Sequence, residues 1–334
     1  MALLWIDGFE GYGTSSVAGT TYRYESASTA NDYINAGELT GYCLSQVGDS
    51  FVLLTPPLTQ DPTLIAGCAF LATDSTAARW IRFYDNDVRG IGVKFNAAVP
   101  STVTIQLGNN IINETILDTV LLANTWYYFE VKVFCHATSG SVEVRIDGET
   151  VVLLTGINTK AGTDSFYNKV QLSLQYCKVD NYYICDSVGG SLNDFLGPCR
   201  VIGIFANEDS TPLDWTPSSG TSHYALIDEN PFSATDYLSV AVQGATDYFK
   251  YPKLVGNSTV LGIQISTTCT RSAGSSVIFQ QPIEYNGQTA LGPNTQVMGT
   301  DYTDVRHVSV VDPDTGEQWT IDKLADAKFG IRIV

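Results

Sequence analysis

The chain of 334 residues is long enough for two domains of ordinary size or for one large β domain. Hydrophobic residues make up 44% and charged residues only 16%, a balance typical of a β-rich protein with a sizeable core and many turns. The net charge of −17 and the lack of a basic patch argue against nucleic acid and anionic lipid as partners.

The N-terminal segment MALLWIDGFEGYG has no cationic region followed by a long apolar stretch, so we expect no secretory signal and synthesis in a cytoplasm. No run approaches the roughly 20 apolar residues of a membrane helix, so we expect no membrane insertion. The seven cysteines include no CxxC pair, which zinc sites usually show, and we expect buried free thiols. These patterns predict no cofactor.

Alternation with a period of two dominates the first part of the chain. In residues 125–134 (TWYYFEVKVF), Phe129 and Val131 share one face, and Tyr128 and Glu130 share the other. Residues 141–154 form a second alternating run, in which Asp147-Gly148 supplies the turn of a tight hairpin. Residues 169–186 alternate as well. These patterns predict antiparallel strands with one face in water.

The composition changes in residues 187–198 (SVGGSLNDFLGP), which contain three glycines and one proline and lack alternation. We expect a connector here, with a domain boundary near residue 198. The alternation restarts at residue 200, and residues 321–328 (IDKLADAK) predict one short helix between strands. The chain is thus predicted to be all-β, with domains 1–198 and 199–334.

Candidate sites are few. The stretch 179–200 holds five acids and thiols (Asp180, Cys185, Asp186, Asp194 and Cys199). Alternation puts Cys185 and Asp186 on opposite faces, so we interpret the stretch as a hinge in preference to a metal site. Asp85, Asn86 and Asp87 are weak calcium candidates, because their oxygens share one turn. That turn is equally explained by Asx side chains that bond their own backbone.

Two catalytic alternatives were considered. Glycoside hydrolysis needs two carboxylates roughly 5 to 9 Å apart. The nearest pattern, Glu143 and Asp147, falls on the face expected to meet solvent, and Asp147 lies in a turn. The three histidines are scattered and no GxSxG motif occurs, so Ser-His-Asp catalysis is not indicated. We expect His307 at the surface or a sheet edge, and His223 as a structural histidine or a pH-sensitive contact. The sequence predicts no catalytic residues.

The motifs WYYFEVKV (126–133), SVEVRIDG (141–148), KVQLSL (169–174) and VDNYYICD (179–186) follow one another in an order that resembles concanavalin A-like, laminin-G-type jelly-roll domains. The resemblance covers roughly residues 1–186. It implies that the opening DGFEGY (7–12) belongs to a short first strand beside the closing strand. The fold expected is an N-terminal concanavalin A-like jelly-roll sandwich followed by a smaller β-sandwich with one short helix.

A second resemblance rests on DNYYICDSVGGSLNDFLGPCRV (180–201), DWTPSSGTSHYALIDENP (214–231), TDYL (235–238) and DPDTGEQWT (312–320). Together these look like a recurring bacteriophage virion protein, described as a structural, tail or fibre component. The resemblance implies a non-enzymatic subunit in a virion, made in the host bacterial cytoplasm. Its partners would be capsid, tail or fibre subunits and copies of itself, with a trimer favoured.

The alternative is a carbohydrate-binding adhesin that contacts a host glycan. Both interpretations depend on aromatic side chains, because Tyr favours interfaces and sugar-stacking sites. The ligand or interface candidates are Tyr22, Tyr24, Tyr33, Tyr84, Trp215, His223 and Tyr224.

Overall fold

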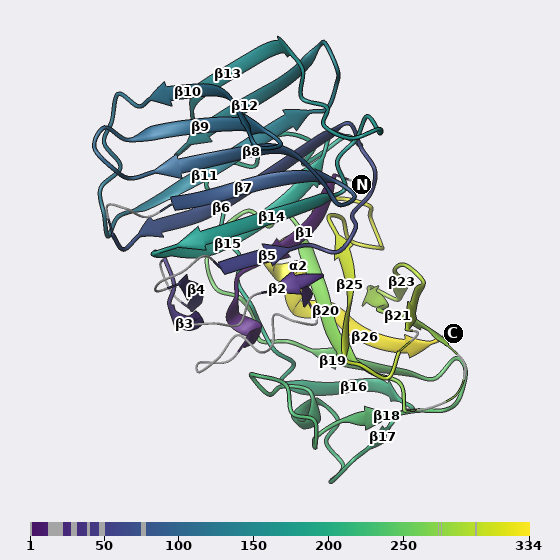
Figure 1. Ribbon diagram of the computed structural model, residues 1–334. Coiled ribbons are helices and arrows are strands. Elements are labelled where there is room, and N and C mark those ends of the chain that lie inside the picture. The colour runs from purple at the N-terminus through teal and green to yellow at the C-terminus, as the bar shows by residue number, and fades with distance from the viewer. Residues whose placement is uncertain are drawn as a thin grey trace. The chain divides into compact units, whose positions relative to one another are not determined.

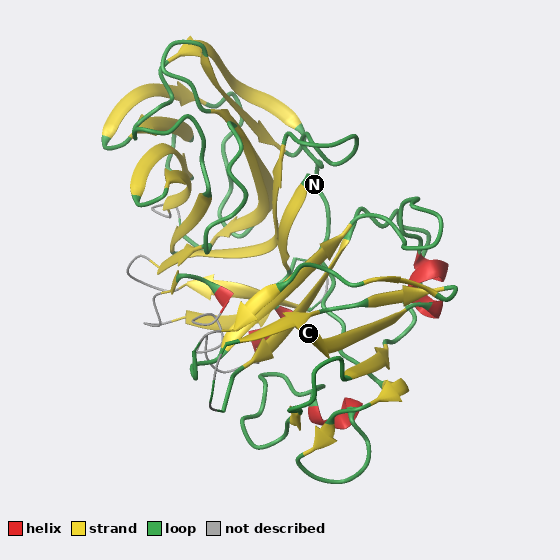
Figure 2. Ribbon diagram, turned by 90° about the vertical axis from the view of Figure 1, so that its right-hand side faces the viewer, coloured by secondary structure: helices red, strands yellow, loops and turns green. Residues whose placement is uncertain are grey.

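The structure is a computed structural model, and it describes residues 2–12, 23–27, 32–38, 41–46, 51–74, 78–272, 274, 276–297 and 299–334. The chain divides into two compact units, residues 1–203 and 204–334. Strands dominate both units (Figure 2), and the helix expected near residue 321 is α2 (Ile321–Asp326). The prediction of an all-β sandwich protein with a short helix is confirmed. No helix of the described residues is long and apolar enough to span a membrane.

Unit 1 contains two antiparallel sheets. Sheet A has the order β13-β12-β11-β6-β15-β4-β3, with β1 also paired to β15. Its strands are β1 (Leu3–Asp7), β3 (Asp32–Ala36), β4 (Tyr42–Gln46), β6 (Thr63–Ala72), β11 (Trp126–Phe134), β12 (Gly140–Ile146), β13 (Glu149–Ile157) and β15 (Cys177–Asp186). β1 pairs with β15, as expected of a first strand beside the closing one. The strand ends at Asp7, however, and residues 10–12 of the expected segment form a 3-10 helix, η1 (Glu10–Tyr12).

Sheet B has the order β10-β9-β8-β7-β14-β5-β2. Its strands are β2 (Ser26–Ala27), β5 (Phe51–Leu54), β7 (Ala78–Asp85), β8 (Val88–Asn96), β9 (Thr102–Leu107), β10 (Asn110–Ile116) and β14 (Lys169–Gln175). The middle strands β8, β7 and β14 lie side by side in Figure 1. β10 forms one edge of the sheet.

The core of unit 1 lies between the two sheets, where alternate residues of each strand point inward. Phe129 of β11 packs on Phe95 of β8 and Phe70 of β6, with ring centroids 4.3 and 5.6 Å apart. The predicted hairpin is present as β12 and β13, and both turn residues, Asp147 and Gly148, have positive φ as a primed turn requires. Sequence alternation therefore identified the inward faces of these strands correctly.

One face predicted to meet water is covered. Tyr128 and Glu130, on the outer side of β11, are 3% and 0% exposed. Residues 194–201, here called the strap, cross this face: the Gly197 N–H donates to Glu130 Oε1 at 2.9 Å and the Leu196 N–H to the Tyr183 hydroxyl at 3.1 Å. Since the strap packs on sheet A, unit 1 continues to residue 203, beyond the boundary expected at 198.

Unit 2 is built from three sheets: β16-β19-β26-β21-β24 with β22 and β23 attached, β17-β18, and β20-β25. The strands are β16 (Glu208–Leu213), β17 (Thr216–Pro217), β18 (Leu238–Ser239), β19 (Thr246–Lys250), β20 (Ile263–Cys269), β21 (Val277–Gln280), β22 (Ile283–Tyr285), β23 (Gln288–Ala290), β24 (Thr295–Val297), β25 (Thr303–Ser309) and β26 (Lys328–Ile333). Two small clusters, around Phe279 and around Trp319, form its core.

His307, on β25, corrects a further expectation. It was expected at the surface or a sheet edge. β25 is an edge strand, because its sheet has two strands, but His307 is 8% exposed and its Nδ1 lies 2.7 Å from the carbonyl oxygen of Gln281. Burial lowers the pKa of His307, so the neutral ring is favoured. Alternation along the strand does not predict this contact, because Gln281 lies 26 positions away in the sequence.

Candidate functional site

The five acids and thiols of 179–200 do not converge as ligands, although the Cys185 thiol donates to the Asp194 carbonyl oxygen at 3.5 Å. Asp180 accepts hydrogen bonds from the backbone of Glu38 at 2.9 Å, and Asp194 accepts one from Lys132 Nζ at 2.8 Å. Cys185 and Cys199 are thiols whose pKa burial raises. Within the described residues, no group of three or more His, Cys, Asp or Glu side chains is placed to hold a metal ion. The stretch closes sheet A and continues into the strap.

The calcium candidates form the turn between β7 and β8. Asp85 Oδ2 accepts a hydrogen bond from the Asp164 N–H at 3.1 Å, and Asp87 Oδ1 accepts one from Lys169 Nζ at 2.9 Å. Asn86 has the positive φ of a turn residue. Its amide donates to Asp85 Oδ1 at 3.0 Å and to Asp164 Oδ2 at 3.4 Å, so these side chains bond one another. The calcium role stays a prediction, which no ligand cluster among the described residues supports.

The carboxylates considered for glycoside hydrolysis are also engaged. Glu143 Oε1 accepts from Arg145 Nε and the Thr150 hydroxyl, both at 2.9 Å. Burial alone would raise the pKa of Glu143, but these hydrogen bonds outweigh it and lower the pKa. Asp147 Oδ1 accepts from the Tyr128 N–H at 2.7 Å. A general acid needs a raised pKa, whereas the pKa of Glu143 is lowered.

The tyrosine candidates of unit 1 are internal where they are described. Tyr24 is 3% exposed and its hydroxyl donates to Asp7 Oδ2 at 2.9 Å. Tyr84 is 9% exposed and its hydroxyl donates to Gln171 Oε1 at 3.1 Å. Tyr22 and the side chain of Tyr33 lie outside the described residues. Tyr24 thus packs within the unit, whereas Tyr84 contributes to a surface site through Gln171.

The candidates of unit 2 gather around two aspartates. His223 Nδ1 lies 2.6 Å from Asp247 Oδ2, and the backbone N–H of Trp215 donates to Asp247 Oδ1 at 2.8 Å. Asp209 accepts from the backbone N–H groups of His223 and Tyr224 at 2.9 and 2.6 Å. His223 and Asp247 are buried, so this arrangement satisfies polar groups inside the unit. The interface role of these residues stays a prediction.

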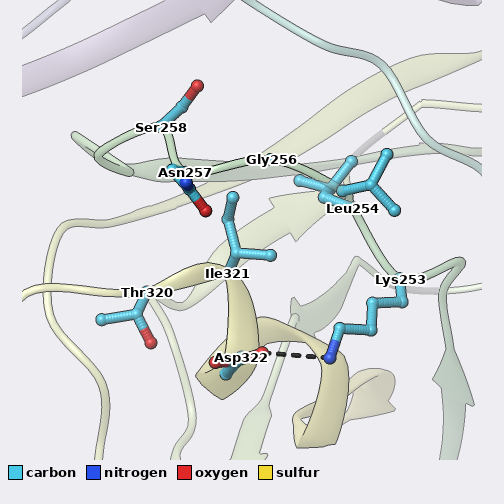
Figure 3. Close-up of a pocket in the computed structure, with 9 residues that line it drawn as sticks. Lys253, Leu254, Gly256, Asn257, Ser258, Thr320, Ile321 and Asp322 are labelled. Atoms are coloured by element: carbon cyan, nitrogen blue, oxygen red, sulfur yellow. Dashed lines mark hydrogen bonds and ion pairs between the residues drawn. The ribbon is translucent and has the colours of Figure 1, made fainter.

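A hollow of about 410 Å³ in unit 2 lies between residues 253–258 and the start of α2 (Figure 3). Lys253 Nζ and Asp322 Oδ1 form an ion pair of 3.0 Å across it, and both side chains are mostly exposed. The Thr320 hydroxyl caps α2 by accepting from the Lys323 N–H. The charges of this hollow therefore neutralise each other, and its polar groups serve the helix start.

The second hollow lies on the outward face of sheet B. It has about 280 Å³, and we call it the sheet-B hollow. It is lined by Val52, Ala78, Trp80, Arg82, Arg89, Gln171, Ser173 and Gln175. These residues come from β5, β7, β8 and β14, whose other faces build the core.

Strand register brings the central residues together. Arg82 lies directly opposite Gln171 on β14 and Gly92 on β8. Trp80 lies directly opposite Ser173 on β14. Such neighbours point to the same side of a sheet. Alternation along β7 sends Ile81 and Phe83 into the core and leaves Trp80 and Arg82 on the outer side.

A glycine lets the large side chains lie flat across β8. A Cβ atom at Gly92 would stand 3.3 Å from Arg82 Cγ and 3.5 Å from the Trp80 ring. The Arg82 guanidinium carbon lies 4.2 Å from the Trp80 ring centroid, so the two groups stack as one surface. Gln171 Oε1 fixes this surface by accepting from Arg82 Nη1 at 3.0 Å and from the Tyr84 hydroxyl.

Sequence reasoning missed this hollow. The signal available was the run ARWIRFYD (78–85), which alternates large polar or aromatic residues with core residues. The run predicts a strand, but it does not show that Trp80 lies beside Ser173, because this pairing joins residues 93 positions apart. The hollow therefore depends on long-range register.

No family model and no curated protein sequence matches the chain. Solved structures share the fold. The alginate lyase Aly36B is 11% identical, with 55% of this chain and 96% of the lyase covered at a TM-score of 0.40. The carbohydrate-binding module CBM66 from Bacillus subtilis is 11% identical, with 48% and 95% covered at 0.34. Peanut lectin is 8% identical, with 56% and 98% covered at 0.33.

Proposed function

We propose that unit 1 binds carbohydrate in the sheet-B hollow. The observation that supports this function is the stack of Trp80 and Arg82, held in place by Gln171 on an outward sheet face. Aromatic rings contact the apolar faces of sugars, and planar amide and guanidinium groups bond the hydroxyl groups around them. The remaining lining residues, Ser173 and Gln175 among them, add hydroxyl and amide groups.

The hollow is open, and its contacting groups are already ordered. Ordered side chains lose less conformational entropy on binding, which favours affinity for a flexible oligosaccharide. The proposal retains the adhesin interpretation of the sequence and moves its site from the tyrosines to Trp80 and its neighbours.

The test is binding of an oligosaccharide array to the full chain and to Trp80→Ala. We expect the substitution to weaken binding of any bound sugar by about tenfold or more, because the stacking surface is lost. Trp126→Ala, which removes a half-buried tryptophan from sheet A, is the matched control. Failure of every sugar to bind, or equal binding by Trp80→Ala, would overturn the proposal.

A second proposal is the structural role in a virion that the sequence resemblance implies. The edge strand β10 favours it, because Ile111 and Ile116 are 61% and 65% exposed beside unpaired backbone groups. The test is light scattering after gel filtration. We expect an oligomer that Ile111→Lys together with Ile116→Lys dissociates, and a monomer at every concentration would contradict assembly through this edge.

A further inference from the structure

The charge of the sheet-B hollow differs from that of the whole chain. The chain carries −17, yet the described residues that line the hollow include two arginines and no aspartate or glutamate. Lys94 of β8, the cross-strand neighbour of Trp80, adds a third cation. Its Nζ lies 5.8 Å from the Trp80 ring centroid. A positive site thus lies on an acidic protein.

The arginines of the hollow have neutral partners. Arg82 Nη1 donates to Gln171 Oε1, and Arg89 Nη1 donates to Asn109 Oδ1 at 2.8 Å. By contrast, Lys169 at the end of β14 is paired with the carboxylates of Glu25 and Asp87. Carboxylates are therefore present near this face, but in the described residues they neutralise the lysine and not the arginines.

The two guanidinium groups also repel each other. Burial, followed by the charge of Arg89, lowers the pKa of Arg82 to about 10, so the Arg82 guanidinium is still charged at neutral pH. Arg82 Nε is buried and makes no hydrogen bond within the structure. An anion placed between the two side chains would relieve the repulsion between the guanidinium groups and accept hydrogen bonds from them.

We propose that the sheet-B hollow selects acidic sugars, whose carboxylate or sulfate group is bound by Arg82 and Arg89 while a sugar ring contacts Trp80. This inference rests on the proposed carbohydrate-binding function and names its ligand class. Arg is suited to the role because its planar fork matches both anionic groups. The net charge of −17 keeps such ligands away from the rest of the surface.

The test uses an array of neutral, uronate-containing and sulfated oligosaccharides, at low and at physiological salt, with carboxyl-reduced forms of the uronates. We expect acidic sugars to bind about tenfold or more tightly than their neutral counterparts, because a charge-assisted hydrogen bond is lost on reduction. Binding should weaken as salt is added. The uronate and sulfate arms distinguish the two anionic groups.

The variants Arg82→Gln and Arg89→Gln should each lose the preference for acidic sugars. Lys160→Gln, which removes the same charge from a half-buried position in unit 1, should keep it. Thermal unfolding of each variant establishes that the sheet is intact. Equal binding of neutral and acidic sugars would overturn the preference and leave the proposed function standing. No binding to any sugar would overturn both, and acidic binding that survives both substitutions would overturn the assigned site.

Discussion

Arg79 lies on the core side of β7, opposite Trp80 and Arg82. Its side chain is 0% exposed, and none of its three guanidinium nitrogens has a hydrogen-bond partner within the structure. One favourable contact is with the Phe129 ring, whose centroid lies 5.7 Å from Arg79 Cζ. Burial lowers the pKa of Arg79, which shows that the environment disfavours its charge.

We predict that Arg79→Met stabilises unit 1 by about 1–4 kcal/mol, because an apolar side chain of similar volume replaces an unpaired buried cation. The measurement is the free energy of unfolding in denaturant. Arg82→Met is the control on the other face of the same strand, and it should change stability little while it impairs sugar binding. A lower stability of Arg79→Met would contradict the prediction.

Asp312 begins the turn DPDTG in unit 2 and is 1% exposed. Burial alone would raise its pKa, but hydrogen bonds from Lys323 Nζ at 2.7 Å and from Thr315 outweigh this. The pKa of Asp312 is therefore well below its usual range. A carboxyl with a lowered folded-state pKa contributes stability above its unfolded pKa of about 3.9, and loses it as the pH falls further.

Asp312→Asn should accordingly lower the Tm at neutral pH by about 5 °C, because the amide keeps the shape but loses the charge that pairs with Lys323. The difference from the natural protein should shrink as the pH falls below about 4, where the Asp312 carboxyl of the unfolded natural chain begins to protonate. Scanning calorimetry at several pH values measures this. Asp326→Asn, at an exposed position, is the control. A difference that is constant with pH would disprove the role of charge.

At the scale of elements, local patterns predicted what is decided locally. The hairpin of β12 and β13 follows from alternation on both sides of Asp147-Gly148, since few residue pairs adopt two successive positive φ angles. The short α2 was predicted from helix propensity, and the Thr320 cap explains where it begins. Neither feature depends on contacts that are distant in sequence.

The outer face of β11 shows the limit of such patterns. Polar and apolar residues alternate there, but alternation does not say what covers each face. Phe195 of the strap lies between two cations of sheet A, with Arg145 Cζ and Lys132 Nζ at 4.0 and 4.7 Å from the ring centroid. The only available signal was apolar content, Phe195 and Leu196, in a segment otherwise read as a hinge.

The same limit applies to the sheet-B hollow. Trp80 and Arg82 are recognisable as strand residues, but Gln171 and Ser173 come from β14, which is separated from β7 by six other strands in sequence. A site that is assembled from four strands becomes visible only once their register is known. The virion and tyrosine hypotheses relied on motifs, whereas this site is a property of topology.

At the scale of the whole molecule, the strap decides where unit 1 ends. Its backbone N–H groups at Leu196, Gly197 and Val201 donate to Tyr183, Glu130 and Asn181, which are all buried on sheet A. Each such bond contributes on the order of 1 kcal/mol. Unit 1 has its own core between its two sheets, so residues 1–203 contain the contacts that a separate fold requires.

We therefore predict that a fragment of residues 1–203 unfolds cooperatively, while a fragment of residues 1–193 is less stable by on the order of 3 kcal/mol. For a domain of this size, the corresponding loss of Tm is about 6–12 °C. Circular dichroism on heating measures both values. A fragment of residues 1–198 should fall between them, because it keeps the Leu196 and Gly197 bonds but lacks those of Cys199 and Val201. If the fragments 1–193 and 1–203 melted together, the strap would be a linker, and the boundary near 198 expected from composition would be the better description of the chain.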